Sequence, residues 1–463
     1  MRYLVLGGLL LAACAAGDLD TGSTDTSGID STTLATVTGT TEPDPGAPAA
    51  PEVPSGPVGP AVEEAVDLLL TGVLTTDWDV GEVDGLVETG DPRTAWLLAD
   101  LLRFYQHGDE VERLALAFSE LTGAELDPDA VQFVSASNRL IAWDMPAWDR
   151  YPQAKQRIFG PLEETWDRFF AEDRHIDWRL VTWGGVGPDT RPLDDNGPCP
   201  CIPALDHPAT TDADGGDWYP DRDIVFGVVV EGEALALPKH QMEVHEMVHV
   251  TLGDRELGIP YCTLCGSAQA YYVDDVPGVD RVVLRTSGLL SRSNKLMYDL
   301  STGSAFDTFT GRALSGTLAG EGVTLGQVSV VASTWGDWKE AHPETRIVAE
   351  DGGIGRTYIV DPLGGRDAAG PIFPVGDVDP RLPTQEKVVG VIKGDGTPVA
   401  FPVQATRERL ADGHIEFKGL TVRLVDSVRV FDAGGDELVS HESFWFAWSQ
   451  FHPGTLLWSA QSG

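Results

Sequence analysis

The spacing of apolar side chains divides this chain of 463 residues into four consecutive segments. Residues 1–13 hold one short apolar run. Residues 14–61 contain almost no large apolar side chain and cannot bury enough surface to fold. Apolar positions recur at helical spacing over residues 62–175, and short β-branched runs bounded by Gly or Pro fill residues 176–463. The pattern predicts an α+β protein in which a helical segment precedes a mainly-β body.

Individual elements can be placed within these segments. The pair Asp91-Pro92 is typical of a helix start, so we expect a helix over Thr94–Leu102. A second helix is expected over Val111–Leu121, with Gly123 at its end. The run Ile224–Val230 predicts a strand. The Trp and Leu stripes of the helices are packing residues, and they indicate no chemistry.

The β body contains an internal duplication. The motif Trp335-x-x-Trp338-x-x-x-His342-Pro343-x-Thr345 recurs with identical spacing as Trp445-x-x-Trp448-x-x-x-His452-Pro453-x-Thr455. Gly227-Val228 and Gly390-Val391 precede the two copies in the same order. These echoes predict two unequal repeats, at about residues 176–348 and 380–458. Packing and turn formation explain a motif that both repeats share, so the extra chain of the first repeat is the candidate for function.

The beginning of the chain resembles a bacterial lipoprotein signal. Arg2 precedes the apolar run, which is too short to span a bilayer, and Leu11-Ala12-Ala13-Cys14 has the pattern of a lipobox. We expect removal of residues 1–13 and a lipid on Cys14. The alternative is an ordinary signal peptide that happens to contain a cysteine. Ala15 favours the outer membrane of the bacterial cell envelope, and residues 14–61 would tether the lipid to the folded part.

The charge of the chain limits its partners. The sequence has 32 Lys and Arg against 72 Asp and Glu, which gives a formal net charge of −40 at pH 7. Such a chain is repelled by phosphate backbones and by anionic lipid, so a nucleic-acid partner is not expected. Neither a protein nor a small-molecule partner can be identified from the composition.

The sharpest motif is His245-Glu246-Met247-Val248-His249, which has the H-E-x-x-H pattern of zinc peptidases. On a helix both imidazoles share one face and bind one zinc ion, with Glu246 as the catalytic base. The supporting residues are missing, because Leu252 and Arg255 stand where one large class of these enzymes has Gly and His. A zinc metallopeptidase with His249 as a ligand is therefore one hypothesis among several.

Four cysteines remain if Cys14 is lipidated. The stretch Cys262-Thr263-Leu264-Cys265-Gly266 has the form of a metal knuckle, in which the glycine takes a positive φ. It also suits a redox dithiol or a plain disulfide, and oxidation is the default in an exported protein. Cys199-Pro200-Cys201 adds a second pair. A staple between the two pairs is as plausible as a four-thiolate zinc site.

A series of short motifs resembles the bacterial domain-of-unknown-function family 3179 over roughly residues 140–460. In chain order the motifs are Val181–Val186, Gly227–Pro238, His245–Val248, Tyr261–Ala268, Ser293–Asp299, Phe309–Gly311, Phe444–Trp448 and His452-Pro453. The resemblance implies a domain but no activity. Relatives typically have Asn in place of His249, which implies that the complete H-E-x-x-H pattern is accidental. Cys199 and Cys201 look like a local addition.

Two hypotheses about function remain equally open. In the first, His245, Cys262 and Cys265 bind zinc or copper. Glu246 would carry a proton there, and Asn294, Tyr298 and Asp299 would surround the ligands. In the second, the body is a non-enzymatic, surface-tethered binding or scaffold module whose cysteines form structural disulfides.

Overall fold

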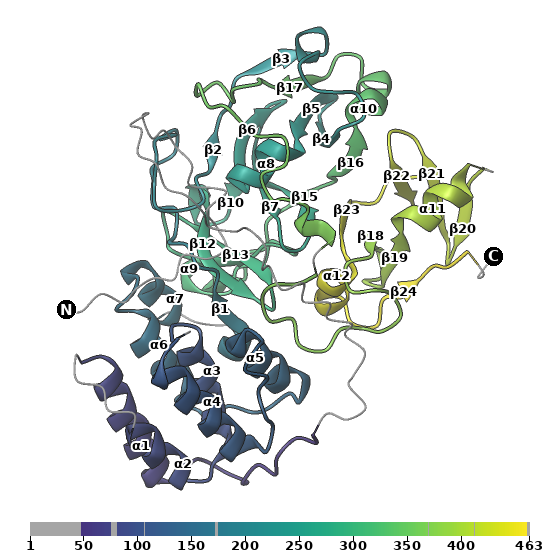
Figure 1. Ribbon diagram of the computed structural model, residues 1–463. Helices are drawn as coiled ribbons and strands as arrows, with labels where there is room; N and C mark the ends of the chain where they lie inside the picture. The colour runs from purple at the N-terminus through teal and green to yellow at the C-terminus, as the bar shows by residue number, and fades with distance from the viewer. Residues whose placement is uncertain are drawn as a thin grey trace, which may run out of the picture.

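The computed structural model describes residues 48–75, 81–105, 107–171, 175–368, 370–411 and 413–460. The expected signal peptide, Cys14 and residues 15–47 of the expected tether lie outside this part of the chain. Residues 48–61 were expected to belong to the tether, but they lie against the helical part: the carbonyl oxygen of Gly56 accepts from Nη1 of Arg93 at 2.6 Å, and the first helix begins at Pro60. Figure 1 shows the helices of the N-terminal part gathered on one side of the β body. The α+β class, with the helical part first, is confirmed. None of the described helices is both long enough and apolar enough to cross a membrane.

Within the described residues, seven α-helices precede the first strand: α1 (Pro60–Val73), α2 (Gly81–Glu88), α3 (Ala95–Leu102), α4 (Asp109–Thr122), α5 (Gln132–Ala142), α6 (Tyr151–Phe159) and α7 (Asp167–Ala171). The expected helix start is present, since the carboxylate of Asp91 accepts a hydrogen bond from the N–H of Arg93 at 3.1 Å. α4 ends at Gly123, whose φ of 74° is the left-handed conformation that glycine adopts without strain. Local signals therefore place both helices.

The helical part packs against the β body through a shared core. Val181, Leu289 and Leu296 of the β body belong to the same apolar cluster as the helices. Lys155 of α6 is 1% exposed; its ammonium donates to the carbonyl oxygen of Val181 at 2.5 Å and pairs with Asp100 at 2.7 Å. A buried ammonium is tolerated only when its donors are satisfied. This contact therefore ties the helices to the first strand.

The β body consists of small sheets arranged like a five-bladed propeller (Figure 1). The first sheet has the strand order β1 (Val181–Trp183), β12 (Leu284–Ser291), β13 (Asn294–Asp299), β14 (Ala305–Asp307). The second has the order β15 (Gln327–Val328), β9 (Ala270–Tyr272), β7 (Arg255–Cys262), β6 (Met247–Leu252), β2 (Leu205–Asp206), with β8 (Ser267–Ala268) paired to β7. The third has the order β16 (Val331–Thr334), β4 (Ile224–Val230), β5 (Glu233–Pro238), β17 (Arg346–Val348), β3 (Thr210–Asp212).

The last two sheets belong to the C-terminal part of the chain. The fourth sheet has the order β23 (Ser440–Phe444), β18 (Lys387–Ile392), β19 (Pro398–Pro402), β24 (Leu456–Leu457). The fifth has the order β20 (Ile415–Phe417), β21 (Leu420–Leu424), β22 (Val428–Phe431). A separate hairpin joins β10 (Asp274–Val276) to β11 (Val279–Arg281). The helices between the strands are α8 (Lys239–His245), α9 (Gly316–Gly320), α10 (Trp335–Ala341), α11 (Val403–Leu410) and α12 (Trp445–Phe451).

Two of the sheets share one topology. β16-β4-β5-β17 and β23-β18-β19-β24 pair antiparallel, antiparallel and parallel in the same order. In both, a tryptophan of the following helix donates from Nε1 to a threonine hydroxyl: Trp338 to Thr345 at 2.9 Å, and Trp448 to Thr455 at 3.0 Å. The duplicated motif therefore builds the same packing unit twice.

The second tryptophan of each motif lies directly over a strand glycine. A Cβ built on Gly227 would overlap the ring of Trp338, and one built on Gly390 would overlap the ring of Trp448. The absent side chain lets the indole lie flat on the strand, so both glycines are required by close approach of a neighbour.

Gly390→Ala is expected to lower the free energy of unfolding by about 1–3 kcal/mol, because the added methyl group must displace the ring of Trp448. Denaturant unfolding measures the change. Gly394→Ala is the matched control, since a Cβ there meets nothing within 4 Å, and it should stay within about 0.5 kcal/mol of the parent chain. Equal effects of the two substitutions would contradict the packing argument.

Candidate functional site

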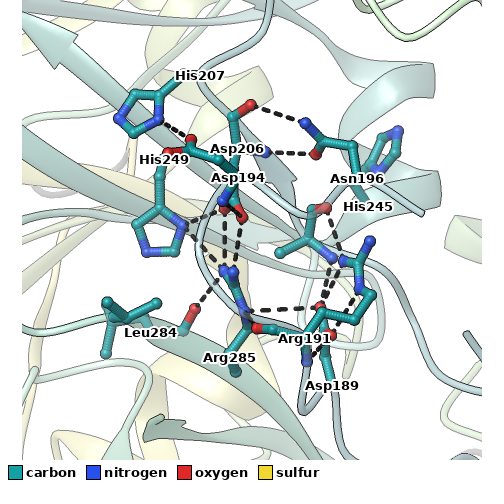
Figure 2. Close-up of polar contacts among 12 residues, drawn as sticks. Asp189, Arg191, Asp194, Asn196, Asp206, His207, His245, His249, Leu284 and Arg285 are labelled. Carbon is teal, nitrogen blue, oxygen red and sulfur yellow. Dashed lines mark hydrogen bonds and ion pairs between the residues drawn. The ribbon is translucent and has the colours of Figure 1, made fainter. Parts of the chain in front are cut away.

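The H-E-x-x-H segment does not form a helix. α8 ends at His245, and Glu246 takes a left-handed conformation with φ of 52°. The chain then continues as β6 from Met247. The expectation that His245 and His249 share a helical face is therefore wrong, because one ends a helix and the other lies in a strand. In Figure 2 the two imidazoles lie apart. The geometry of a zinc peptidase is not formed.

His245 is held by two hydrogen bonds within the protein. Its Nδ1 lies 2.8 Å from the carbonyl oxygen of Pro203, and its Nε2 lies 2.7 Å from the hydroxyl of Tyr358. The side chain is almost fully buried, and burial lowers the pKa of His245 to about 4. The imidazole is therefore neutral, with Nδ1–H donating to the carbonyl and Nε2 accepting from the hydroxyl. Both nitrogens are engaged.

Cys262 and Cys265 form a disulfide inside an apolar cluster. Their sulfurs lie 4.0 and 3.8 Å from the carbonyl oxygen of Ser293. Gly266 has a φ of 61°, as the knuckle pattern predicts. Across the described residues, the ligand atoms of His245, Cys262 and Cys265 are not gathered within 4.8 Å of one another. The expected His/Cys/Cys cluster is therefore not assembled, because the imidazole is bonded elsewhere and the sulfurs are bonded to each other.

Glu246 joins the Cys262–Cys265 turn to β13. Its Oε2 pairs with the ammonium of Lys295 at 2.7 Å, and its Oε1 accepts from the hydroxyl of Thr263 at 2.7 Å. Lys295 also donates to the main-chain carbonyl of Glu246 at 2.8 Å. The two charged side chains are 9% and 4% exposed, so neither charge is solvated and each depends on the other. In this structure Glu246 is an anchor between segments.

The turn between β12 and β13 is strained. Its two central residues, Arg292 and Ser293, have φ values of 46° and 66°, a conformation that hairpin turns usually reserve for Asn and Gly. Arg292 is held there by hydrogen bonds from Nε and Nη2 to the carbonyl oxygen of Val375, at 3.0 and 2.9 Å. The strained turn directs the carbonyl of Ser293 toward the disulfide. Non-glycine residues of this kind concentrate at functional sites.

The residues expected around the ligands separate into two places. Asn294 lies at this turn, where its Nδ2 donates to the carbonyl oxygen of Arg292 at 3.0 Å. Tyr298 instead donates to the carbonyl oxygen of Asp189 at 2.7 Å. The carboxylate of Asp299 accepts from the N–H of Val283 at 2.8 Å. Asn294 and Tyr298 are on the same face of β13, so distance along the strand separates them, about 13 Å at about 3.3 Å per residue.

A second polar cluster, centred on Asp206, was not expected from the sequence (Figure 2). Arg285 donates to Asp206 from Nη1 to Oδ1 at 3.0 Å and from Nη2 to Oδ2 at 2.6 Å. Nδ1 of His249 lies 2.8 Å from the same Oδ1. All three residues are at most 2% exposed. Nε2 of His249 is buried without a hydrogen-bond partner among the described residues.

The charges of this cluster follow from its contacts. Burial alone would raise the pKa of Asp206, but hydrogen bonds from His249 and Arg285 outweigh it and hold that pKa well below its usual range. Burial lowers the pKa of His249, although Asp206 opposes the change. The cluster therefore contains a carboxylate, a guanidinium and a neutral imidazole whose Nδ1–H donates to the carboxylate.

The cysteines of the other pair, Cys199 and Cys201, form a disulfide next to Asp189. The two sulfurs and a carboxylate oxygen lie within 4.8 Å of one another, the spacing of a metal site. Both oxygens of Asp189 already accept hydrogen bonds, from Arg191 at 2.7 to 3.1 Å and from the N–H of Ala204 at 2.9 Å. With the sulfurs also bonded to each other, these three groups offer no free set of ligand atoms.

One feature of the sequence indicates these buried ion pairs: a charged residue stands next to an apolar run. Arg285 follows the apolar run Val282-Val283-Leu284, and Lys295 directly precedes the run Leu296-Met297-Tyr298. A charged residue in a buried strand requires a partner. The identity of that partner could not be read from the sequence, because Asp206 and Arg285 are 79 positions apart.

Arg285→Met is expected to lower the free energy of unfolding by about 3–5 kcal/mol at pH 7, because it leaves the carboxylate of Asp206 buried and unpaired. Adding Asp206→Asn should recover part of this loss, as measured by denaturant unfolding of the single and double variants.

The depressed pKa of Asp206 stabilises the fold above the unfolded-state pKa of about 4, and this contribution is lost as the pH falls. Asp206→Asn should therefore lose less stability than the parent chain between pH 5 and pH 3. Identical pH profiles would contradict the assignment.

Comparison with curated proteins and with solved structures gives no significant match. One protein-family model does match, over residues 199–431, which covers both disulfides, the Glu246–Lys295 pair and the Asp206 cluster but not Asp189 or Arg191. The match is narrower than the motif resemblance, which began near residue 140, and it confirms the expected family. The chain belongs to the family described as protein of unknown function, DUF3179.

Proposed function

We propose that the β body is a binding or scaffold module held together by buried polar contacts, without a catalytic or metal centre at the His245–Glu246 segment or the Cys262–Cys265 turn. One observation carries this proposal: the ligands and the base of the expected His/Cys/Cys metal site are bonded to the protein itself. His245 uses both ring nitrogens, Glu246 uses both carboxylate oxygens, and Cys262 is bonded to Cys265. Groups bound in this way hold segments of the fold together.

The competing hypothesis is a zinc or copper centre formed by His245, Cys262 and Cys265. It requires the disulfide to open and His245 to leave both Pro203 and Tyr358. The buried sulfurs and the engaged imidazole favour the module.

We also propose that the module is exported and held at the bacterial envelope, in the outer membrane, by a lipid on Cys14. The support is the pattern Leu11-Ala12-Ala13-Cys14, together with two disulfides, which form in oxidising compartments. Residues 14–47 would then link the lipid to the folded part.

The chain purified without chelators is expected to contain no stoichiometric zinc or copper and no free thiol in either cysteine pair, because all four sulfurs are in disulfides. Elemental analysis and thiol titration of the denatured chain measure both quantities. One metal per chain would contradict the module if it were lost in Cys262→Ser/Cys265→Ser and kept in His249→Asn. That result would establish the metal centre instead.

Labelled palmitate is expected to be incorporated into the chain expressed in a bacterium that processes lipoproteins, and not into Cys14→Ser, because the thiol of Cys14 carries the lipid. Gel fluorography measures the label. Cys262→Ser/Cys265→Ser is the control for loss of a cysteine and should keep the label. Equal labelling of the Cys14→Ser variant and the parent chain would exclude the lipid anchor.

A further inference from the structure

The disulfides of this protein differ in their surroundings. Cys262 and Cys265 are 2% and 0% exposed and lie in an apolar cluster with Phe309 and Phe444. Cys201 is 8% exposed, and Cys199 is only partly buried in the loop between β1 and β2. A thiolate from another molecule must reach a sulfur before it can exchange with it. The Cys199–Cys201 disulfide is therefore the more accessible of the two.

The Cys199–Cys201 loop has a brace that does not involve the disulfide. Arg191 donates from Nη1 to the carbonyl oxygen of Gly197 at 2.8 Å and from Nη2 to that of Ala204 at 2.9 Å, on the two sides of the cysteine pair. Asp189, which is 0% exposed, holds Arg191 in place with both carboxylate oxygens. The loop thus keeps its path when the sulfurs separate.

The sequence between the cysteines also favours opening and closing. A single residue, Pro200, separates them, so the disulfide closes a very small ring and removes little entropy from the unfolded chain. The ring of Pro200 fixes its φ, and Pro198 and Pro203 flank the pair. Two thiols on so stiff a segment remain close to each other. A disulfide that adds little stability and can form again after reduction is suited to thiol–disulfide exchange.

We propose that Cys199 and Cys201 form a thiol–disulfide exchange site whose substrates are cysteine pairs of other exported proteins. This inference goes beyond the binding or scaffold role proposed for the β body, and it does not depend on that role. In the oxidising step, a thiolate of the substrate attacks Sγ of Cys199, and the Cys199–Cys201 bond breaks. Its electron pair goes to Sγ of Cys201, which takes up a proton.

The second substrate cysteine completes the reaction. Its thiolate attacks the substrate sulfur of the mixed disulfide, and the electron pair goes to Sγ of Cys199, which takes up the second proton. The substrate loses two electrons and two protons and gains a disulfide, whereas Cys199 and Cys201 gain both electrons and both protons. The reverse sequence reduces a substrate disulfide.

The charge near the site indicates which substrates react fastest. Asp194 and Asp195 lie in the same loop and are exposed, with the side chain of Asp194 64% exposed. The chain as a whole has a net charge of −40. Such a surface attracts basic partners and repels acidic ones, with an effect that salt weakens. Cysteine pairs flanked by Lys or Arg are therefore the favoured class.

The first test compares the two disulfides within one folded chain. The full chain is incubated with dithiothreitol without denaturant, the thiols are blocked with a maleimide at increasing times, and labelled peptides are identified by mass spectrometry. Cys199 and Cys201 are expected to be labelled at least about tenfold faster than Cys262 and Cys265. Labelling of all four at one common rate, equal to the rate of global unfolding, would overturn the proposal.

The second test traps the intermediate with a synthetic peptide that contains one disulfide flanked by lysines. Cys201→Ser should hold this peptide on Cys199 as a mixed disulfide, whereas Cys199→Ser should hold at least about tenfold less on the more buried Cys201. A peptide flanked by glutamates should react more slowly, and the difference should shrink at high salt. Equal trapping on both variants, or trapping on neither, would rule out the assigned roles.

The third test distinguishes thiol–disulfide exchange from two alternatives, a purely structural disulfide and a metal site. Because Arg191 braces the loop, Cys199→Ser/Cys201→Ser should abolish peptide exchange and change the melting temperature by less than about 2 °C. A much larger drop would show that the disulfide is a structural brace.

The reduced full chain is also mixed with zinc. Stoichiometric zinc that is lost in Cys199→Ser/Cys201→Ser would overturn exchange in favour of a metal site.

Discussion

The left-handed turn at Glu246 is the constraint on which the arrangement around the Cys262–Cys265 disulfide depends. It ends α8 after His245 and sends the chain into β6, so that neighbouring side chains leave in different directions. A non-glycine residue in this conformation needs stabilising contacts. The main-chain carbonyl of Glu246 accepts from Lys295 at 2.8 Å and from the N–H of Tyr261 at 3.0 Å, and its carboxylate binds Thr263. The turn thus brings together segments from three strands.

The duplication preserved packing and changed the polar contacts. The tryptophan-to-threonine hydrogen bond is present in both copies, but the motif histidines differ. Nε2 of His342 lies 2.8 Å from the carboxylate of Asp426, whose pKa falls to about 2 because the hydrogen bond from Arg429 outweighs burial. Both histidines pack on the second tryptophan of their motif, with 4.1 Å between the ring centroids of His342 and Trp338 and 4.2 Å for His452 and Trp448. Burial lowers the pKa of His452 to about 4. An apolar contact survives when the residues around it change, whereas the contact between His342 and Asp426 is lost when either residue is replaced.

Buried charged side chains connect parts of this molecule that are far apart in sequence. Lys155 joins the helices to the first strand, Lys295 joins β13 to Glu246, and Arg285 joins β12 to Asp206. Taking such charges out of water costs several kcal/mol for each ion, so these pairs add little net stability compared with apolar residues. Their effect is on specificity, because a wrong arrangement would leave a charge buried and unpaired.

Local order could be read from the sequence, because it depends on residues that are neighbours along the chain. The helix start at Asp91, the glycine end of α4, the strand at Ile224–Val230 and the positive φ of Gly266 all follow from a few adjacent side chains. The helix expected across His245 and His249 was wrong because the left-handed turn at Glu246 is stabilised from another strand. Only the tertiary structure decided which polar groups meet, since His245 and Tyr358 are 113 positions apart, and Glu246 and Lys295 are 49 apart. The sequence by itself determined several local elements, the repeated tryptophan motif and the family, whereas the partners of the buried charges depend on how the sheets pack, which no local pattern records.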